Sequence, residues 1–204
     1  ESIFTESGDH LRLARLATNV GNIYYRQDRH REAMEQYHHA LESFSRRGEP
    51  RDIAAALSNL ATCSITLGEF SSALDYYTQA QHHCRRHGLA NLAARADYNI
   101  AYLHYLRGDY RDAFDIYWRS RELCRQTGDA YHEALCDLDE AEMCLELNRN
   151  TQGMLLARRA AAGFSRQGLR YEEAKSLLNV AVAASQSGDL RAASRALLAA
   201  RKLF

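Results

Sequence analysis

The chain has a single proline, Pro50, among 204 residues, and almost no lysine. Lys175 and Lys202 are its only lysines, so 24 of the 26 basic residues are arginines. This bias is typical of a GC-rich genome and favours a bacterial source. No apolar run approaches the ~18 to 20 residues that a membrane span needs, and no basic-then-apolar signal segment opens the sequence. We therefore expect neither a membrane segment nor a membrane partner.

Charge of either sign is not in excess. The 26 basic and 26 acidic residues give a formal net charge of zero, which provides no general attraction to nucleic acid. The five cysteines are odd in number and form no CxxC pair. A disulfide framework is therefore excluded, and a reduced, cytoplasmic location is expected.

Motifs for catalysis and cofactor binding are missing as well. The sequence contains no GxSxG, no HExxH and no glycine-rich phosphate loop. Nine histidines are present, but His38–His39 and His82–His83 are adjacent pairs whose side chains diverge on a helix and cannot chelate one ion. We expect no enzyme activity, no catalytic residue, no metal and no cofactor.

Glycine recurs at an interval of forty residues. A second series in the same register contains residues that tolerate a left-handed backbone at a tight turn, and a third contains Phe or Cys. The series are Gly8, Gly48, Gly88, Gly128 and Gly168; Asp28, Gly68, Gly108, Asn148 and Gly188; and Phe4, Phe44, Cys84, Cys124, Phe164 and Phe204. A fixed period of this length predicts a repeat solenoid.

Each repeat contains two amphipathic stretches. In repeat 49–88, apolar residues recur at three- and four-residue steps from Ile53 to Cys63, stop at Gly68, and resume from Phe70 to Cys84. This spacing predicts two helices of about 16 to 18 residues joined by a tight turn. Small residues keep a fixed phase in both helices and predict close helix packing. The sequence therefore predicts an all-α fold.

Three segments carry a family resemblance: NVGNIYYRQDRHREAMEQYHHAL, NLATCSITLGEFSSALDYYTQAQ and NIAYLHYLRGDYRDAFDIYWRS. They resemble tetratricopeptide repeats, in a forty-residue variety. The resemblance covers essentially the whole chain and implies a right-handed α-solenoid of antiparallel helix pairs. We expect a single solenoid over residues 1–204, with repeats at 9–48, 49–88, 89–128, 129–168 and 169–204 after a partial unit, 1–8.

Two features of this division carry further expectations. Repeat 129–168 is expected to be the weakest, because Asn148, Asn150 and Gly153 replace the turn glycine, aromatic and alanine of other repeats. Both ends of the chain fall inside a second helix without a polar cap. This indicates a segment of a longer array, or end-to-end self-association through the terminal helices.

A polar series follows the first helices. Asn19, Asn59, Asn99, Asp139 and Asn179 share one phase, and asparagine is an indifferent helix former. The resemblance implies that this phase faces a concave groove, where a carboxamide can pair with both the C=O and the N–H of an extended peptide. The alternative is that these side chains hold neighbouring helices together by internal hydrogen bonds.

Aromatic and polar residues extend the predicted groove. Tyr98, Tyr102 and Tyr105 form a stripe at i, i+4 and i+7, and tyrosine suits recognition because it combines apolar area with a polar tip. The alternative assigns the stripe to the core. The other groove candidates are Asn22, Tyr25, Arg26, Thr62 and Arg95. Further along, a mixed apolar and acidic surface is expected from Leu138, Glu142, Leu145, Glu146, Leu178 and Val182.

Some family members hold a C-terminal carboxylate in a clamp of cations and asparagines. Asn22, Asn59 and Arg95 match three of its positions, but Thr18 and Asn99 stand where cations are needed, so we do not expect this ligand. The sequence predicts a scaffold that binds a protein or extended peptide, mainly in its first three repeats. The alternative is a regulatory segment of a larger signalling protein, because the C-terminal repeats are also similar to those beside bacterial caspase-like proteases and in ATP-dependent transcriptional regulators.

Overall fold

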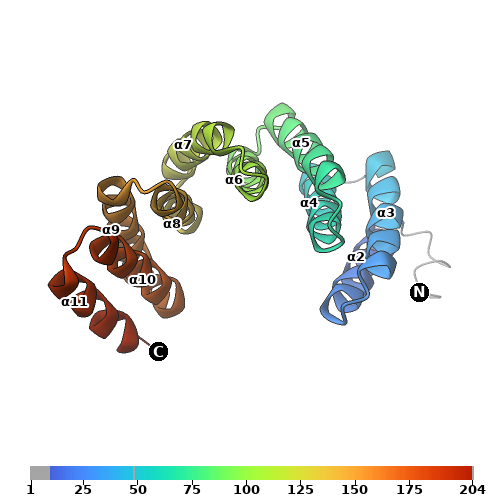
Figure 1. Ribbon diagram of the computed structural model, residues 1–204. Helices are drawn as coiled ribbons and strands as arrows, with labels where there is room; N and C mark the ends of the chain where they lie inside the picture. The colour runs from blue at the N-terminus through green and yellow to red at the C-terminus, as the bar shows by residue number, and fades with distance from the viewer. Residues whose placement is uncertain (1–9, 48, 204) are drawn as a thin grey trace. The chain divides into compact units, whose positions relative to one another are not determined.

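The computed structural model describes residues 10–47 and 49–203, and its regular elements are all α-helices (Figure 1). The helices are α2 (His10–Arg26), α3 (His30–Arg47), α4 (Pro50–Thr66), α5 (Phe70–Arg86), α6 (Ala90–Leu106), α7 (Tyr110–Thr127), α8 (Ala130–Glu146), α9 (Asn150–Arg166), α10 (Arg170–Gln186) and α11 (Leu190–Arg201). Even-numbered helices open a repeat and odd-numbered helices complete it. The predicted all-α, paired-helix architecture is confirmed.

Tight turns separate the helices. Within the described residues, every member of both predicted turn series has a positive φ, including the non-glycine residues Asp28 (58°) and Asn148 (55°). After α4, the Glu69 amide donates to the Ser64 carbonyl and the Gly68 amide donates to the Ile65 carbonyl. This pair of bonds is the Schellman arrangement that satisfies the last carbonyls of a helix. Gly8, Gly48, Phe4 and Phe204 lie outside the described residues.

The chain divides into two compact units, Glu1–Ile100 and Ala101–Phe204, and helix α6 contains the division. In the first unit, α3 packs on α2 and on α4, and α5 packs on α4. In the second, α8 packs between α7 and α9, and α10 packs between α9 and α11. Each second helix therefore closes its own repeat, and α3, α7 and α9 also support the first helix of the next.

Small residues let the paired helices approach closely. Ala33, Ala73 and Ala113 are fully buried, as their fixed phase in the second helices predicts. Gly21 is packed so tightly that a Cβ there would lie 2.7 Å from the Tyr37 ring. The buried tyrosine fills the space that the missing side chain leaves.

Repeat 129–168 has helices as long as those of the other repeats. Both α8 and α9 contain 17 residues, and Asn148 adopts the left-handed turn in place of glycine. A Cβ at Gly153 would meet Leu145 at 3.0 Å, so Leu145 occupies the space beside this glycine. Leu138 and Leu145 are only 1% and 7% exposed. Their predicted place on a mixed apolar and acidic surface is therefore wrong, because they belong to the core.

Candidate functional site

A groove of about 460 Å³ lies between α4 and α6 in the first compact unit. Ala80 and Cys84 of α5 also line it, and both are about 1% exposed. The two flanking helices contribute mainly small and polar side chains: Arg51, Asp52, Ala54, Ala55, Ser58 and Asn59 from α4, and Leu92, Arg95, Ala96 and Asn99 from α6. The small side chains keep the space open, and the polar ones are spaced along it.

Asn59 and Asn99 bring the predicted asparagine series into this groove. Each is partly exposed and lines the same cavity from a different helix. Within residues 10–47 and 49–203, neither carboxamide is hydrogen-bonded to another residue. Their donors and acceptors therefore face the groove unpaired by the protein, which favours the binding interpretation over the structural one at these two positions.

Two arginines give the groove a positive character. Arg51 and Arg95 are exposed, and neither has a carboxylate partner in the described part of the chain. The one acid in the lining, Asp52, accepts from Arg15 at 2.9 and 3.2 Å. Because Asp52 is already paired, the groove presents two cations to any ligand. Arg95 was predicted from the sequence, whereas Arg51 was not. Arg51 lies eight residues before Asn59, just over two turns along α4.

Other predicted groove residues take part in bonds within the repeats. The buried Tyr37 donates to Asn22 at 2.8 Å, and the Tyr77 and Thr62 hydroxyls lie 3.2 Å apart. Burial raises the pKa of Tyr37 to about 12, so this phenol stays a neutral donor. Asn22 and Thr62 therefore help to hold their own helix pairs together.

Asp139 occupies the asparagine phase but does not face solvent. It is 6% exposed and accepts a hydrogen bond from the buried Tyr117 at 2.9 Å. Asn179 donates to Glu142 at 3.3 Å, and Lys175 also reaches Glu142 at 3.0 Å. In the second compact unit the asparagine phase is therefore structural, and Asp139 is corrected from a groove residue to a core residue.

The predicted tyrosine stripe lies on α6. Tyr98 is in the first compact unit, whereas Tyr102 and Tyr105 are in the second, where their rings meet edge to face with centroids 6.2 Å apart. All three are partly exposed. Tyr105 donates to Glu146 at 2.8 Å, and burial together with this bond raises the pKa of its phenol. Tyr105 is thus held in place by the next repeat.

Near the start of the chain, the remaining candidates lie on α2. Asn19 and Arg26 are exposed. The hydroxyl of Tyr25 is 3.3 Å from that of Thr66, and its ring packs edge to face on His30. None of these three residues lines the groove between α4 and α6, so they extend the first-helix surface without forming part of the cavity.

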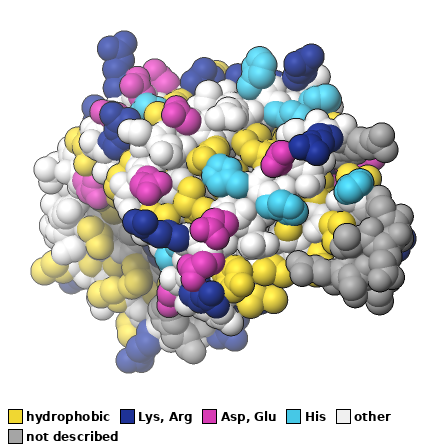
Figure 2. Space-filling model, turned by 90° about the vertical axis from the view of Figure 1, so that its right-hand side faces the viewer, with side chains coloured by type: hydrophobic (Ala, Val, Ile, Leu, Met, Phe, Trp, Pro, Cys, Tyr) yellow, Lys and Arg dark blue, Asp and Glu magenta, His cyan; other side chains and the backbone are white. Residues whose placement is uncertain are grey.

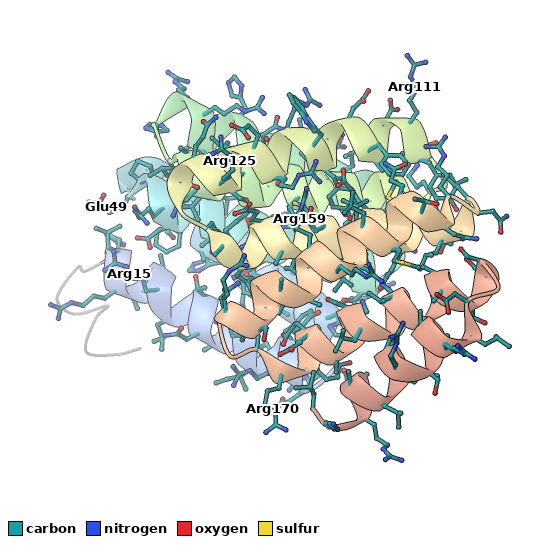
Figure 3. The ribbon with its side chains drawn as sticks, turned by 90° about the vertical axis from the view of Figure 1, so that its left-hand side faces the viewer. Arg15, Glu49, Arg111, Arg125, Arg159 and Arg170 are labelled. Atoms are coloured by element: carbon teal, nitrogen blue, oxygen red, sulfur yellow. The ribbon has the colours of Figure 1, made fainter. Side chains whose placement is uncertain are left out.

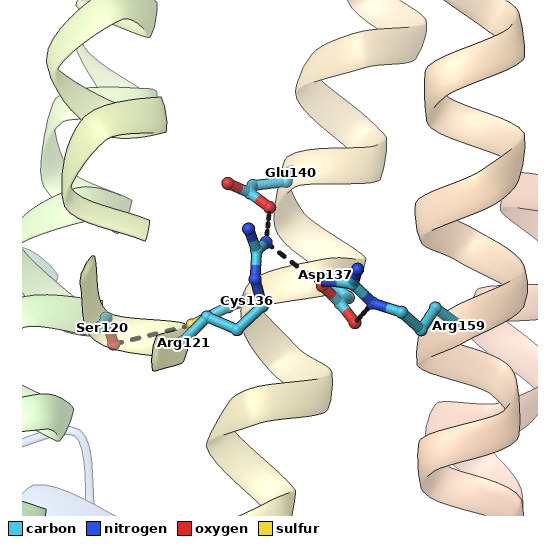
Figure 4. Close-up of polar contacts among 6 residues, drawn as sticks. All are labelled: Ser120, Arg121, Cys136, Asp137, Glu140 and Arg159. Atoms are coloured by element: carbon cyan, nitrogen blue, oxygen red, sulfur yellow. Dashed lines mark hydrogen bonds and ion pairs between the residues drawn. The ribbon is translucent and has the colours of Figure 1, made fainter. Parts of the chain in front are cut away.

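The second compact unit contains a buried charge cluster that was not predicted from the sequence (Figure 4). Asp137 and Glu140 of α8 are 3% and 4% exposed. Arg121 of α7 pairs with both, and Arg159 of α9 pairs with Asp137 from the other side. Burial raises the pKa of Glu140 even though Arg121 opposes the shift.

The same junction one repeat earlier has a related arrangement. Asp97 of α6 is 3% exposed and accepts from Gln81 and Arg85 of α5. Asp97 and Asp137 are forty residues apart, whereas Leu57 and Leu177 hold this phase in the neighbouring repeats. A search for charged residues at a phase that is otherwise apolar could have found both junctions.

The histidines and cysteines provide no metal site in the described residues. No three His, Cys, Asp or Glu side chains there are placed to share an ion, and Figure 2 shows histidines dispersed among other side chains on one face. All five cysteines are buried and free, and burial raises the pKa of the Cys63 and Cys144 thiols to about 11. No helix in this part of the chain is long and apolar enough to cross a bilayer.

Comparison with known proteins gives matches of two kinds. Family models described as tetratricopeptide repeat match residues 12–82 and 98–127. No curated protein sequence matches the chain. Among solved structures, BtubC (BKLC) from P. vanneervenii has a TM-score of 0.84 at 16% identity, with 98% of this chain and 83% of that one covered.

Two further solved structures have different domain contexts. A Rap protein complexed with competence and sporulation factor has a TM-score of 0.77 at 17% identity, with 93% of this chain and 53% of that one covered. A signal transduction ATPase with numerous domains from Pyrococcus horikoshii, which has a tetratricopeptide repeat sensor, has a TM-score of 0.81 at 11% identity, with 92% and 29% covered. At these identities the structural matches establish the fold alone. The two family models show that residues 12–82 and 98–127 belong to the tetratricopeptide repeat family.

Proposed function

We propose that this chain is a non-enzymatic protein-binding module, and that the groove between α4 and α6 binds an extended, acidic segment of a protein partner. The observation that carries the proposal is the pair Asn59 and Asn99, whose carboxamides line one cavity and have no hydrogen bond to another described residue. Each can donate to and accept from a peptide backbone. Arg51 and Arg95 supply the charge that favours an acidic ligand.

The affinity of such a site depends on several weak contacts. One net hydrogen bond contributes about 1 kcal/mol, so the two carboxamides together contribute about 2 kcal/mol at one bond each. Their loss corresponds to a roughly thirtyfold rise in Kd. Main-chain contacts of this kind set the path of the bound segment, and the arginines select its charge.

The test compares Asn59→Ala/Asn99→Ala with the wild type. Peptides selected from a displayed random library on the immobilised wild-type chain are labelled with fluorescein and titrated by anisotropy. The double variant is expected to bind about thirtyfold more weakly and to keep its stability, because alanine is the better helix former. Gln79→Ala is the matched control, since it removes an exposed carboxamide of α5 that does not line the groove.

Three outcomes count against the proposal. Unchanged affinity in the double variant shows that the carboxamides do not contact the ligand. A large loss of helicity or of melting temperature shows that they are structural. A library enriched in basic instead of acidic peptides contradicts the role assigned to Arg51 and Arg95.

A second candidate is a regulatory or sensor segment of a larger signalling protein. It is favoured by the likeness to the repeat sensor of the P. horikoshii ATPase, in which the aligned region is less than a third of the chain. In this case the groove ligand is a segment of the same polypeptide. We then expect an effector domain to be encoded in the same reading frame. That domain should bind these repeats when it is supplied as a separate polypeptide.

Self-association is a separate proposal about the faces of α2 and α11. Ile23 is 55% exposed and Leu197 is 50% exposed. Their equivalents in the other repeats are at most 4% exposed: Cys63, Leu103, Met143 and Ala183 for Ile23, and Tyr37, Tyr77, Tyr117 and Ala157 for Leu197. Stacking of α11 on α2 of a second copy covers both faces. It predicts a mass in solution that rises with concentration, and a constant monomer mass contradicts it.

A further inference from the structure

A second depression, of about 550 Å³, lies on the second-helix side of the second compact unit, between α7 and α9. It shares no residue with the groove between α4 and α6. Aromatic and aliphatic side chains line part of it, and charged side chains from both helices surround them.

Trp118 is the dominant apolar side chain of this depression. It is the only tryptophan of the chain and is 60% exposed. His38, Thr78, Arg158 and Leu198 occupy the same phase in the other repeats, so the repeat fold does not require an indole here. Tryptophan combines a large apolar area with few rotatable bonds, which suits an interaction surface.

The apolar surface continues beside the indole. Phe114 lies one turn before Trp118 on α7 and is partly buried, and Leu147 is 37% exposed at the end of the next repeat's first helix. A partner side chain that packs on Trp118 therefore meets a second aromatic ring and an aliphatic side chain in the same depression. Removing such apolar area from water favours binding.

The charges around Trp118 are unbalanced. Arg121 and Glu140 pair with each other. Arg111 projects away from the ribbon (Figure 3). Neither Arg111 nor Arg149 has a carboxylate partner among the described residues, although the Arg149 guanidinium lies 5.8 Å from the Phe114 ring centroid. Asp115 is the one unpaired acid of the lining, so the free charges sum to a positive surface that complements an acidic partner.

We propose that the depression between α7 and α9 binds an acidic protein segment, with a bulky aliphatic side chain packed on Trp118 and carboxylates paired with Arg111 and Arg149. Arg111 and Trp118 are seven residues apart on α7, which corresponds to about 10 Å. An extended segment spans this distance in about three residues. The ligand therefore carries an acidic group about three residues from the aliphatic residue.

The experiment uses the intrinsic fluorescence of Trp118, which reports on this site alone because the chain has no other tryptophan. The probe is the synthetic peptide acetyl-Asp-Glu-Ser-Glu-Leu-Leu-Asp-Glu-amide, which contains no aromatic residue. Its binding is expected to shift the emission to shorter wavelength, since the aliphatic side chains exclude water from the indole. The same peptide with Asn and Gln in place of Asp and Glu is the control ligand.

The charge contribution is measured with Arg111→Glu/Arg149→Glu. This variant is expected to bind the acidic probe at least tenfold more weakly, because two attractive contacts become repulsive. Arg166→Glu is the matched control: it makes the same type of charge change on α9 but lies outside the depression. Wild-type affinity is also expected to fall as salt rises from 50 to about 300 mM.

The proposal is overturned by any of three results: no change in Trp118 emission up to millimolar probe, equal binding of the Asn and Gln control peptide, or equal affinity of the double variant and the wild type. The salt dependence of wild-type affinity is a test that needs no variant. Binding that does not change with salt contradicts the role assigned to the arginines.

Discussion

Replacement of Arg121 by leucine is expected to destabilise the second compact unit by up to about 3 kcal/mol at pH 7. The change removes the cation that pairs with both Asp137 and Glu140. Arg159 still neutralises Asp137, so Glu140, at 4% exposure, bears most of the loss. Its carboxylate then takes up a proton, and this limits the loss. Burial already raises the pKa of Glu140 above its ordinary value of 4.5 in the wild type. Protonation at pH 7 therefore costs at most about 3 kcal/mol, because each pKa unit corresponds to 1.36 kcal/mol.

The other repeats indicate how this stability can be recovered. Leu41, Leu57 and Leu60 occupy the phases of Arg121, Asp137 and Glu140 at the junction between α3 and α4. Leu41 packs against the cluster that contains the fully buried Leu60. The free energy of unfolding of the triple variant Arg121→Leu/Asp137→Leu/Glu140→Leu is therefore expected to lie within about 1 kcal/mol of the wild-type value or above it. The reason is that apolar residues often replace a buried ion pair without loss of stability.

Urea unfolding is the appropriate assay, followed in parallel by far-ultraviolet circular dichroism and by Trp118 fluorescence. Trp118 lies one turn before Arg121 on α7 and so reports on this junction. Because repeat arrays can unfold in parts, the fluorescence transition is the quantity to compare. Two results contradict this prediction: the Arg121 variant unfolds at the same urea concentration as the wild type, or the triple variant is no more stable than the single variant.

Three further predictions concern packing, pH and thiol reactivity. Gly21→Ala is expected to lower stability by about 1 to 3 kcal/mol in thermal melts, because its Cβ would overlap the Tyr37 ring; an unchanged melting temperature contradicts this. Burial raises the folded-state pKa of Glu140 above 4.5, so its contribution to stability is complete below that pH and is lost as pH rises through the raised pKa. The stability of the wild type relative to Glu140→Gln is therefore expected to fall as pH rises from about 4 toward 7, and a constant difference refutes it. A thiol reagent such as DTNB is expected to leave the native cysteines unmodified for hours at pH 7, since all five are buried; a rapidly reacting thiol identifies a repeat that opens.

The fold was predictable because its signals are local and repeated. The left-handed turn phases, with Asp28 and Asn148 in place of glycine, depend only on backbone conformation. The spacing of apolar residues then determines which face of each helix is buried. Both signals recur at every repeat, so a departure at one position does not obscure the pattern.

The site was less predictable because one phase serves different purposes in different repeats. Asn59 and Asn99 line a cavity, whereas Asp139 at the same phase is bonded to the buried Tyr117. The difference arises one repeat earlier: Tyr37 and Tyr77 contact Asn22 and Thr62 of their own repeats. In the repeat that contains Tyr117 this phase is Tyr102, and Tyr117 donates to Asp139 of the next repeat. A different side chain at this phase changes the hydrogen-bond partner of the buried tyrosine through three-dimensional packing. Sequence periodicity alone does not describe this effect.

The junctions between repeats also determine the order in which the repeats can be arranged. Leu57 lines a depression together with Leu41 of α3, while Asp97 and Asp137 meet Gln81, Arg85 and Arg121. If a recombination event placed the fourth repeat directly after the first, Leu41 would stand in place of Arg121. Glu140 would then be buried without its paired cation, whereas Arg159 of the same repeat would still neutralise Asp137. The tandem copies are thus no longer interchangeable, and gene duplication or loss within this array is restricted to boundaries whose two sides match.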